Sequence, residues 1–538
     1  MSSPPDSFPT YTETRKTSRR SALIFVIMSV IVAFWMVRLI DAPDYTDAHY
    51  HFNAALRVVT RQGLTEPYLW TYIGAPEVLP ESGVFPSHLY WMPLTSLIAA
   101  AGMQILGVDH AGAQLPNVIL LTITAGIGYW LGARLGGSRR HAWMAGLLTL
   151  FSGFFTRYWG VIDTFAPYAA VGAACLVLLG QMGFGARVQS GKSTRWAVIF
   201  AAGVCAGLAH LTRADGVLML IVGVAAVLLE KSEPHNTKAR RHKATKIVLL
   251  TTGYLCVMGL WFARNLNEIG VLLPTGGAQA IWFQSYDDLF NYPPVNTFQT
   301  ALADDTAALF TARLEALTSN LTTFVAVEGM IVLTPLMLIG LIRRRRNPFL
   351  RPFLFYVIGL HLVFTLIFPF PGYRGGLLHS SAALIPFWVT LGVIGLDDVV
   401  GWLGKRRRWN IGAARWVFSA ALMVFAVGLS LWIGERGRVE NAGMPSFYTD
   451  LDALLPTNAR VMINDPAALY GNLGLGGVVV PNAAPDVIAE LGVRYQLDYV
   501  VIEPAGLPAP MRVILENPPP FLREIGRIGD AIVYQINE

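Results

Sequence analysis

The chain has 538 residues, of which 54% are hydrophobic and only 14% are charged, whereas about 25% of residues are charged in a typical soluble protein. The apolar residues are gathered into runs, and residues 21–40 contain no acid, so this segment is long enough to cross a hydrocarbon core of about 30 Å. Because such runs recur along most of the chain, they cannot all be interior helices of a soluble protein. The composition therefore excludes an ordinary soluble domain and predicts an α-helical polytopic membrane protein.

The net charge is +6, and the Lys and Arg residues occur in tight clusters between the apolar runs. This pattern orients spans in a membrane and is not typical of nucleic-acid binding. We therefore expect membrane lipids as partners and no nucleic acid. The cysteines all lie inside apolar runs, which predicts no disulfide framework: Cys175, Cys205 and Cys256.

The basic clusters also predict the topology, because cytoplasmic loops carry an excess of Lys and Arg. If every cluster faces the cytoplasm, the N-terminus lies on the cytoplasmic side of the plasma membrane and the C-terminus on the extracytoplasmic side. Residues 1–18 are then expected to form a disordered cytoplasmic tail. The clusters lie at 15–20, 139–140, 187–195, 231–246, 343–346 and 405–408. About eleven spans follow from this arrangement: 21–40, 114–135, 142–157, 165–184, 196–212, 215–230, 246–264, 321–342, 351–369, 379–402 and 414–434.

Residues 89–107 are apolar but do not fit this count, since a span there would place Arg139 and Arg140 outside. We expect a re-entrant or interfacial helix instead, within a large external loop over 41–113. A second large external loop is expected over 265–320, both within a transmembrane domain of residues 19–435. The tail over 436–538 alternates short β-branched runs with helical patterns, which predicts a small extracytoplasmic α/β domain with a mostly parallel sheet.

Two acidic segments lie on the predicted external face. The first, residues 44–52, places Asp47 among aromatic and His residues just beyond the first span; the second, residues 157–164, is a short turn that contains Asp163. One interpretation is an interfacial aromatic belt with solvated acids. The other is a catalytic or metal site, in which the two carboxylates meet at one membrane depth and share a divalent cation or flank a cationic group.

Three arginines lie at or near the external ends of predicted spans: Arg213, Arg264 and Arg374. Arginine at a helix end commonly extends to lipid headgroups. The alternative explanation for these arginines is a phosphate group bound at the outer leaflet, because one planar guanidinium can hydrogen-bond two phosphate oxygens at once.

Weaker candidates are His88, before the predicted re-entrant helix, Glu328, inside an apolar span, and His379, a few residues beyond Arg374. A buried Glu is costly unless it is paired, protonated or metal-bound. The sequence contains no Walker A, G-x-S-x-G, H-E-x-x-H or Cys-x-x-Cys motif, which disfavours a nucleotide-driven pump.

Several short motifs resemble those of the type C glycosyltransferase superfamily, multi-spanning enzymes that use polyprenyl-phosphate-linked sugars. The segment 47–51 resembles the acidic motif that opens the first external loop of oligosaccharyltransferase catalytic subunits, and 157–164 resembles their second acidic turn. Further similarities are the segment 86–107 with Trp91 and Pro93, the segment 261–270 around Arg264, Arg374 with the Pro386 helix, and the α/β tail.

The resemblance implies roles for these residues. Asp47 would be the general base or a metal ligand, Asp163 a second metal ligand or donor-site acid, and Glu328 a third acidic group, with Mg²⁺ or Mn²⁺ as the metal. Arg374 would hold the donor phosphate. The wider set of expected substrate and phosphate contacts comprises Arg374, Arg264, Arg213, His88, His49, Tyr50 and His379.

The Trp-Trp-Asp-Tyr-Gly acceptor motif of oligosaccharyltransferases is absent. This departure favours a single-sugar transferase, nearer to the protein O-mannosyltransferase and aminoarabinose transferase branches. The expected function is transfer of a sugar from a polyprenyl-phosphate donor to a protein, lipid or glycan acceptor on the extracytoplasmic side. The alternative is a secondary transporter of a small anionic or lipid-linked solute, although transporters tend to show internal repeats and the sequence shows none.

Overall fold

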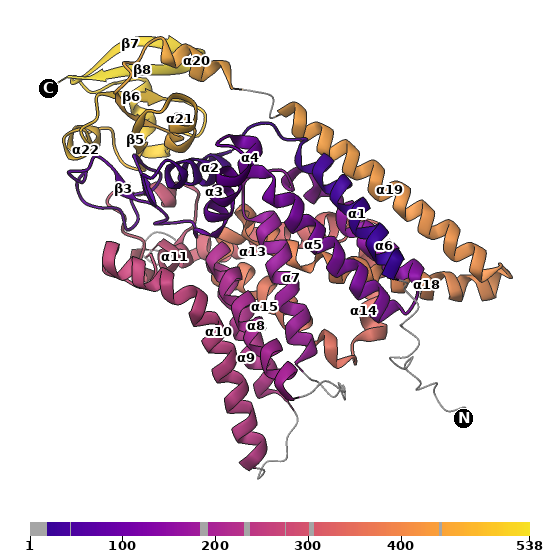
Figure 1. Ribbon diagram of the computed structural model, residues 1–538. Coiled ribbons are helices and arrows are strands. Elements are labelled where there is room, and N and C mark those ends of the chain that lie inside the picture. Colours follow the sequence, from indigo (N-terminus) through magenta and orange to yellow (C-terminus); the bar gives the residue numbers. More distant parts are fainter. Residues whose placement is uncertain are drawn as a thin grey trace.

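The computed structural model describes residues 19–43, 45–182, 192–230, 237–274, 276–300, 306–440 and 444–537. Figure 1 shows a large helical part with a small domain of helices and strands at one end. The first described helix, α1 (Arg19–Val37), begins at the end of the helical part that lies away from this domain, and the last described strand lies inside the domain.

Within the described residues, six helical segments are long and apolar enough to cross a membrane, by length and composition. They are Arg19–Val37, His110–Gly136, Arg240–Ile269, Pro348–Ile367, Pro369–Arg407 and Ile411–Glu440. Four shorter apolar helices accompany them: Leu94–Leu106, Phe165–Gln181, Trp196–Thr212 and Ala214–Leu228. The prediction of an integral multi-pass membrane protein is confirmed.

Glycines allow the helices to pack closely. A Cβ atom on Gly340 of α14 (Thr334–Arg344) would lie 2.0 Å from the Leu391 carbonyl oxygen of α18 (Ile385–Arg407). A Cβ atom on Gly203 of α8 (Lys192–Thr212) would lie equally close to the Leu250 carbonyl oxygen of α10 (Thr237–Ile269). Small residues at such contacts are typical of membrane helices, since their association depends on close van der Waals packing.

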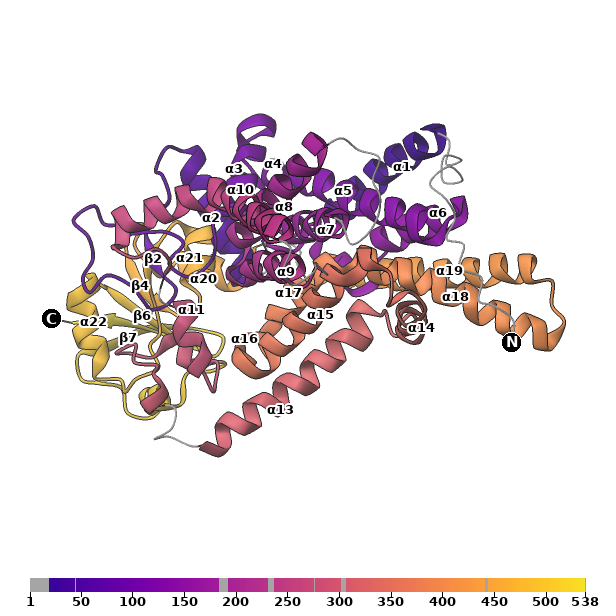
Figure 2. The same cartoon turned by 90° about the horizontal axis from the view of Figure 1, so that it is seen from below.

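The predicted span 321–342 is not one helix. α13 (Thr306–Thr322) runs into a π-helical turn, η7 (Thr323–Glu328), and α14 begins only at Thr334. Met330 and Ile331 between them have φ angles of 43° and 61°. The break follows from Pro335, which lacks the N–H that a continuing helix needs and is favoured at the start of a new one. Much of the last part of the predicted loop 265–320 is thus helical, and α13 lies at an edge of the helical part beside α16 (Pro369–Pro371) (Figure 2).

The remaining helices match the expected positions more closely. They are α1 (Arg19–Val37), α4 (His110–Gln114), α5 (Pro116–Leu131) with η2 (Gly132–Gly136), α6 (Arg139–Leu150), α7 (Phe165–Gln181), α9 (Val217–Leu228), α15 (Arg351–Leu362) and α19 (Ile411–Glu440). The predicted span 142–157 is shorter than expected, because α6 ends at Leu150 and a 3-10 helix follows, η3 (Gly153–Tyr158).

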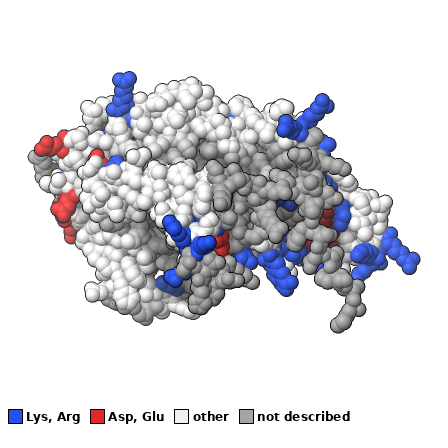
Figure 3. Space-filling model, turned by 60° about the horizontal axis from the view of Figure 1, so that its bottom comes forward, with Lys and Arg blue, Asp and Glu red and all other residues white. Residues whose placement is uncertain are grey.

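Basic residues mark one end of the helices. Arg139 and Arg140 open α6, Arg343 and Arg344 close α14, and Lys405 to Arg407 close α18. Figure 3 brings the bottom of the molecule forward and shows Lys and Arg at several places there, with fewer Asp and Glu. The orientation of these ends relative to the two sides of the membrane stays a prediction.

The terminal domain contains a six-stranded sheet of order β2-β5-β4-β6-β8-β7. Its first four strands are parallel and the last two join antiparallel, which confirms the expected α/β domain with a mostly parallel sheet. The strands are β2 (Tyr68–Leu69), β4 (Arg460–Ile463), β5 (Gly476–Val479), β6 (Tyr499–Ile502), β7 (Leu522–Ile528) and β8 (Ala531–Ile536). The helices are α20 (Ser446–Asp452), α21 (Pro466–Leu473) and α22 (Val487–Tyr495).

The sheet is continuous with the first external loop, because β2 lies at residues 68–69 and pairs with β5. One apolar core joins side chains of both loops to the sheet, including Trp70, Phe283, Phe290 and Val478. The predicted boundary at residue 436 also falls within α19, which continues to Glu440. The loops and the terminal domain therefore form one packed unit over the helical part, and α2 (Thr46–Val59) and α3 (Leu94–Leu106) lie beneath it (Figure 1).

Candidate functional site

Three elements that are distant in sequence bring an acid, a second acid and a histidine together. Asp47 lies in the first turn of α2, Asp163 in the turn before α7, and His379 in α17 (Leu377–Ser381). One potential ligand atom from each residue lies within 4.8 Å of those of the other two. The structure thus places together the two aspartates that the sequence predicted to meet.

Asp163 is held rigidly in this cluster and is only 1% exposed. The Tyr45 hydroxyl donates a hydrogen bond of 2.6 Å to its Oδ2 atom, and the backbone N–H of Thr164 donates to Oδ1. The His379 Nε2 atom lies 3.5 Å from Oδ2. A carboxylate is also favoured here because it lies at the N-terminal end of α7, where the helix dipole is positive.

The two aspartates differ in their electrostatic environment. Burial and the nearby Asp163 carboxylate raise the pKa of Asp47 to about 7, against a hydrogen bond from Trp91 that lowers it. Burial also acts to raise the pKa of Asp163, but His379, His51 and the hydrogen bonds from Tyr45 and Thr164 outweigh it, so that this pKa lies below its usual value. Of the pair, Asp47 is therefore the group suited to accept a proton near neutral pH.

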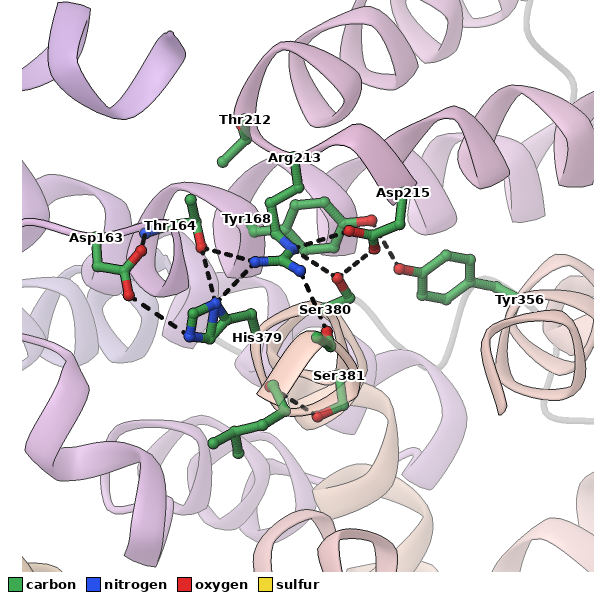
Figure 4. A network of polar contacts seen from close by, with 12 residues as sticks. Asp163, Thr164, Tyr168, Thr212, Arg213, Asp215, Tyr356, His379, Ser380 and Ser381 are labelled. Atoms are coloured by element: carbon green, nitrogen blue, oxygen red, sulfur yellow. Dashed lines mark hydrogen bonds and ion pairs between the residues drawn. The ribbon is translucent and has the colours of Figure 1, made fainter. Parts of the chain in front are cut away.

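A second layer of polar residues fixes His379 (Figure 4). Arg213 donates a hydrogen bond of 2.7 Å to the His379 Nδ1 atom and another of 3.3 Å to the Thr164 hydroxyl. Because Nδ1 accepts from a guanidinium, the neutral ring carries its proton on Nε2, and that N–H is directed at Asp163. Arg213 is itself paired with Asp215 at 3.0 Å, and the Ser380 hydroxyl donates to Asp215.

The charges of this cluster do not balance. Asp215 neutralises Arg213, which leaves Asp47 and Asp163 without an equivalent cation among their described contacts. A divalent cation would neutralise the pair. Since the Nε2 atom of His379 carries a proton in this arrangement, the fitting donors are the two carboxylates with water, a ligand set that suits Mg²⁺ or Mn²⁺.

Glu328 does not join the two aspartates. Its carboxylate accepts a hydrogen bond of 2.6 Å from the Trp388 indole and lies 3.6 Å from the His361 Nε2 atom. The helix break after η7 turns this side chain toward α15 and α18. The expectation that Glu328 is a third ligand is therefore not met by the geometry of the described residues.

Several predicted phosphate ligands instead hold the first external loop in place. Arg264 donates to the carbonyl oxygens of Leu64 and Ser87. The His88 side chain is buried and contacts the hydroxyls of Ser87 and Ser96.

Two further predicted contacts also pack within the protein. The backbone N–H of His88 donates to the Tyr50 hydroxyl. His49 packs against α21, where a Cβ atom on Gly471 would lie 2.7 Å from its Nδ1 atom.

Arg374 has a different environment. Its side chain is exposed, and the guanidinium stacks over the Tyr286 ring at 4.3 Å. Burial and the Asp47 carboxylate raise the pKa of the Tyr286 hydroxyl, whereas the Arg374 guanidinium lowers it. Tyr286 is therefore near enough to both Arg374 and Asp47 to interact with each electrostatically.

Three residues of the site carry no clear signal in the sequence: Tyr45, Asp215 and Asp465. Tyr45 was hidden in an aromatic segment, although its position two residues before Asp47 places it near the cluster. Asp215 lies two residues after Arg213, a spacing that favours an ion pair. Asp465 follows the end of β4 and precedes Pro466, which is typical of a helix N-cap, and its side chain indeed caps α21.

No protein-family model and no curated protein sequence matches the chain. Solved structures do match. The crystal structure of ArnT from Cupriavidus metallidurans bound to undecaprenyl phosphate is 14% identical, with a TM-score of 0.61 over 96% of this chain and 98% of that one. The chain has the fold of the type C glycosyltransferases.

Two structures of the Archaeoglobus fulgidus oligosaccharyltransferase share this fold at lower similarity. The complex of AglB with an inhibitory peptide and a dolichol-phosphate is 13% identical, with a TM-score of 0.52 over 89% of this chain and 69% of that one. The complex with Zn and sulfate is 13% identical, with a TM-score of 0.55 over 89% and 67% of the two chains. The resemblance inferred from the sequence motifs is thus confirmed at the level of the fold.

Proposed function

We propose that this protein is a membrane glycosyltransferase that moves a sugar from a polyprenyl-phosphate donor to an acceptor hydroxyl on the extracytoplasmic side. The observation that carries the proposal is the meeting of Asp47, Asp163 and His379 within one cluster. It lies next to the external loops of a fold shared with ArnT, whose crystal structure contains undecaprenyl phosphate.

Asp47 is the general base in this proposal. The acceptor oxygen attacks the anomeric carbon, the bond between that carbon and the phosphate oxygen breaks, and the phosphate leaves with the electron pair. Asp47 takes the acceptor proton, for which a pKa raised to about 7 is well matched. General-base catalysis of this kind contributes about 10²–10⁴-fold in rate.

Asp163 and His379 have supporting roles. Asp163 is fixed by Tyr45 and Thr164, and it stays ionised beside Asp47. The alternative role of Asp47 is that of a metal ligand: with Asp163 it would hold Mg²⁺ or Mn²⁺, which when bound would stabilise negative charge that develops on the leaving phosphate, and Asp47 would then not act as the base. The neutral His379 ring, held by Arg213, orients Asp163.

Arg374 is the residue we propose for the donor phosphate. It is exposed and stacked on Tyr286, on which the Asp47 carboxylate also acts electrostatically. Arg213, by contrast, has its donors engaged by His379, Thr164, Asp215, Ser380 and the Gly376 carbonyl.

The acceptor is proposed to approach along the edge of the terminal sheet that lies beside the first turn of α2. In the sheet, β4 lies between β5 and β6, so the chain leaves β4 toward one side and returns from β5 to the other side. Parallel sheets bind ligands at the carboxyl ends of the strands where the direction of the connections reverses in this way. Asp465 follows β4 and Glu503 follows β6. Asp465 contacts Thr46, the neighbour of Asp47, so this edge of the sheet faces the base.

The test uses the full chain in nanodiscs with a set of synthetic polyprenyl-phosphate sugars and membrane-extracted acceptors. We expect transfer or slow donor hydrolysis with the wild type and a loss of about 10²–10⁴-fold for Asp47→Asn. Asp41→Asn is the matched control, because Asp41 is exposed and its only described ion pair is with Arg38. Equal rates for Asp47→Asn and wild type would refute the role of Asp47. Uptake of donor or sugar into proteoliposomes without any transfer product would favour the transporter alternative.

A further inference from the structure

A cavity lies outside the aspartate cluster, at the end of α19 that is nearer the terminal domain (Figure 1). Its volume is about 270 Å³, and η3, η7, α17 and α19 form its walls. The apolar part of the wall comes from Phe154, Tyr158, Val327, Leu378 and Ile433. A cavity of this size is large enough for a headgroup or a short length of hydrocarbon chain.

Three charged side chains line the same cavity. Arg157 lies 2.8 Å from one oxygen of Glu440, and Arg436 lies 3.0 Å from the other. Two guanidinium groups thus contact one carboxylate in the lining of this cavity. Within the described part of the chain, Arg436 hydrogen-bonds through Nε alone, which leaves its two terminal nitrogens available to an anion.

The position of the cavity along α19 matches the boundary of a bilayer. One turn before Arg436, Leu431 and Trp432 expose 44% and 58% of their surface, as side chains that face lipid do. Four charged residues then follow in the last turns: Glu435, Arg436, Arg438 and Glu440. Tryptophan beside a charged collar is typical of the membrane–water interface, where phospholipid phosphates lie.

We propose that this cavity binds the phosphate of a lipid, with Arg436 and Arg157 on the phosphate and the apolar wall around the start of the chain. The site is distinct from the proposed reaction centre but is connected to it by stacked rings. Tyr158 stacks on Phe165 at 4.3 Å, and Phe165 contacts His379 at 4.0 Å. A lipid in the cavity would therefore restrict the ring that orients Asp163.

Binding is tested on the full chain in a neutral detergent, by native mass spectrometry and thermal shift, with three probes. Dioctanoyl phosphatidylglycerol carries both phosphate and chains, dioctanoylglycerol carries the chains alone, and inorganic phosphate carries the anion alone. We expect only the phosphatidylglycerol to bind with high affinity. Arg436→Gln should weaken it about tenfold, because a charge-assisted contact is lost.

Matched variants separate this site from general attraction to charge. Arg438→Gln is the control, since Arg438 lies on the same helix but pairs with Glu435 and does not line the cavity; it should leave binding within about twofold. Glu440→Gln should tighten binding, because it removes the competing carboxylate. Ile433→Trp should block binding by filling the cavity without changing its charge.

Equal weakening by Arg436→Gln and Arg438→Gln would overturn the proposal. The proposal would also be overturned if inorganic phosphate or dioctanoylglycerol bound as tightly as the phospholipid. Either result would mean that the apolar wall or the arginines, respectively, contribute nothing to binding. None of these measurements needs transfer activity, so failure here and failure of the proposed enzymatic function are distinguished.

Discussion

Thr46, one residue before Asp47, donates a hydrogen bond of 2.6 Å from its hydroxyl to the Asp465 carboxylate of the terminal domain. The contact joins residues that are 419 positions apart in the chain. Asn53, further along α2, adds a second link of 2.8 Å to the Ala467 carbonyl oxygen. The terminal domain therefore fixes the first turn of the helix that carries the proposed base.

This relationship predicts that Thr46→Val impairs transfer although Thr46 contacts no substrate. The hydrogen bond is to a charged group, and such bonds contribute about 1.5–3 kcal/mol, so we expect transfer to fall about tenfold. Steady-state rates of Thr46→Val, Asp465→Asn and the double variant measure the effect. If the two losses simply multiply in the double variant, the two residues act independently and the contact does not position Asp47. Thr60→Val is the control, because its hydroxyl bonds only to carbonyls of its own helix.

The proximity of Asp47 and Asp163 could be predicted from the sequence. Asp47 follows the predicted span 21–40 and Asp163 precedes the predicted span 165–184, and both of these span ends lie on the predicted external face. The surroundings of Arg264 could not, since its partners are backbone carbonyls whose positions depend on how a loop folds. Glu328 was misplaced for a similar reason: a break of a few residues rotates its side chain away from the cluster. The two-residue strand β2 has no periodicity to detect, so the merging of the first loop with the sheet also had no sequence signal.

The carboxylate pair predicts a divalent cation site. In the full chain titrated with Mn²⁺, electron paramagnetic resonance should detect one bound ion, and Asp163→Asn should weaken its affinity by at least about tenfold, as loss of one of two charged ligands would. Glu328→Gln is the control, since Glu328 contacts Trp388 and His361 instead. Equal affinities for wild type and Asp163→Asn would place the metal elsewhere. An effect of Glu328→Gln as large as that of Asp163→Asn would mean that Glu328 also ligates the metal.

Glu66 predicts a pH-dependent stability. Burial raises its pKa from 4.5 to about 8, against hydrogen bonding to Tyr50 and the charges of Arg264 and Arg57, which lower it. Between pH 4.5 and 8 the unfolded chain ionises this carboxyl while the folded protein keeps it protonated. The free energy of unfolding therefore falls by about 1.4 kcal/mol per pH unit across this window and is then constant.

Replacement by Gln removes that penalty, so Glu66→Gln should raise the thermal unfolding temperature more at pH 8.5 than at pH 5.5. Differential scanning fluorimetry in detergent measures both. Glu81→Gln, at an exposed position in the same loop, should show no such difference. A gain for Glu66→Gln that is the same at both pH values would mean that Glu66 is already ionised in the folded protein.

Arg374 predicts a selective loss of donor binding. Its guanidinium is planar and stacked on Tyr286, so it can meet two phosphate oxygens at once, which a lysine ammonium cannot do with the same geometry. We expect Arg374→Lys to raise the KM for the polyprenyl-phosphate donor about tenfold and Arg374→Gln to raise it further, each with little change in the KM for the acceptor. Arg523→Gln, on β7 with Gln535 as its described partner, controls for the loss of one positive charge. A rise in the acceptor KM with an unchanged donor KM would assign Arg374 to the other substrate and return the phosphate to Arg213 beside His379.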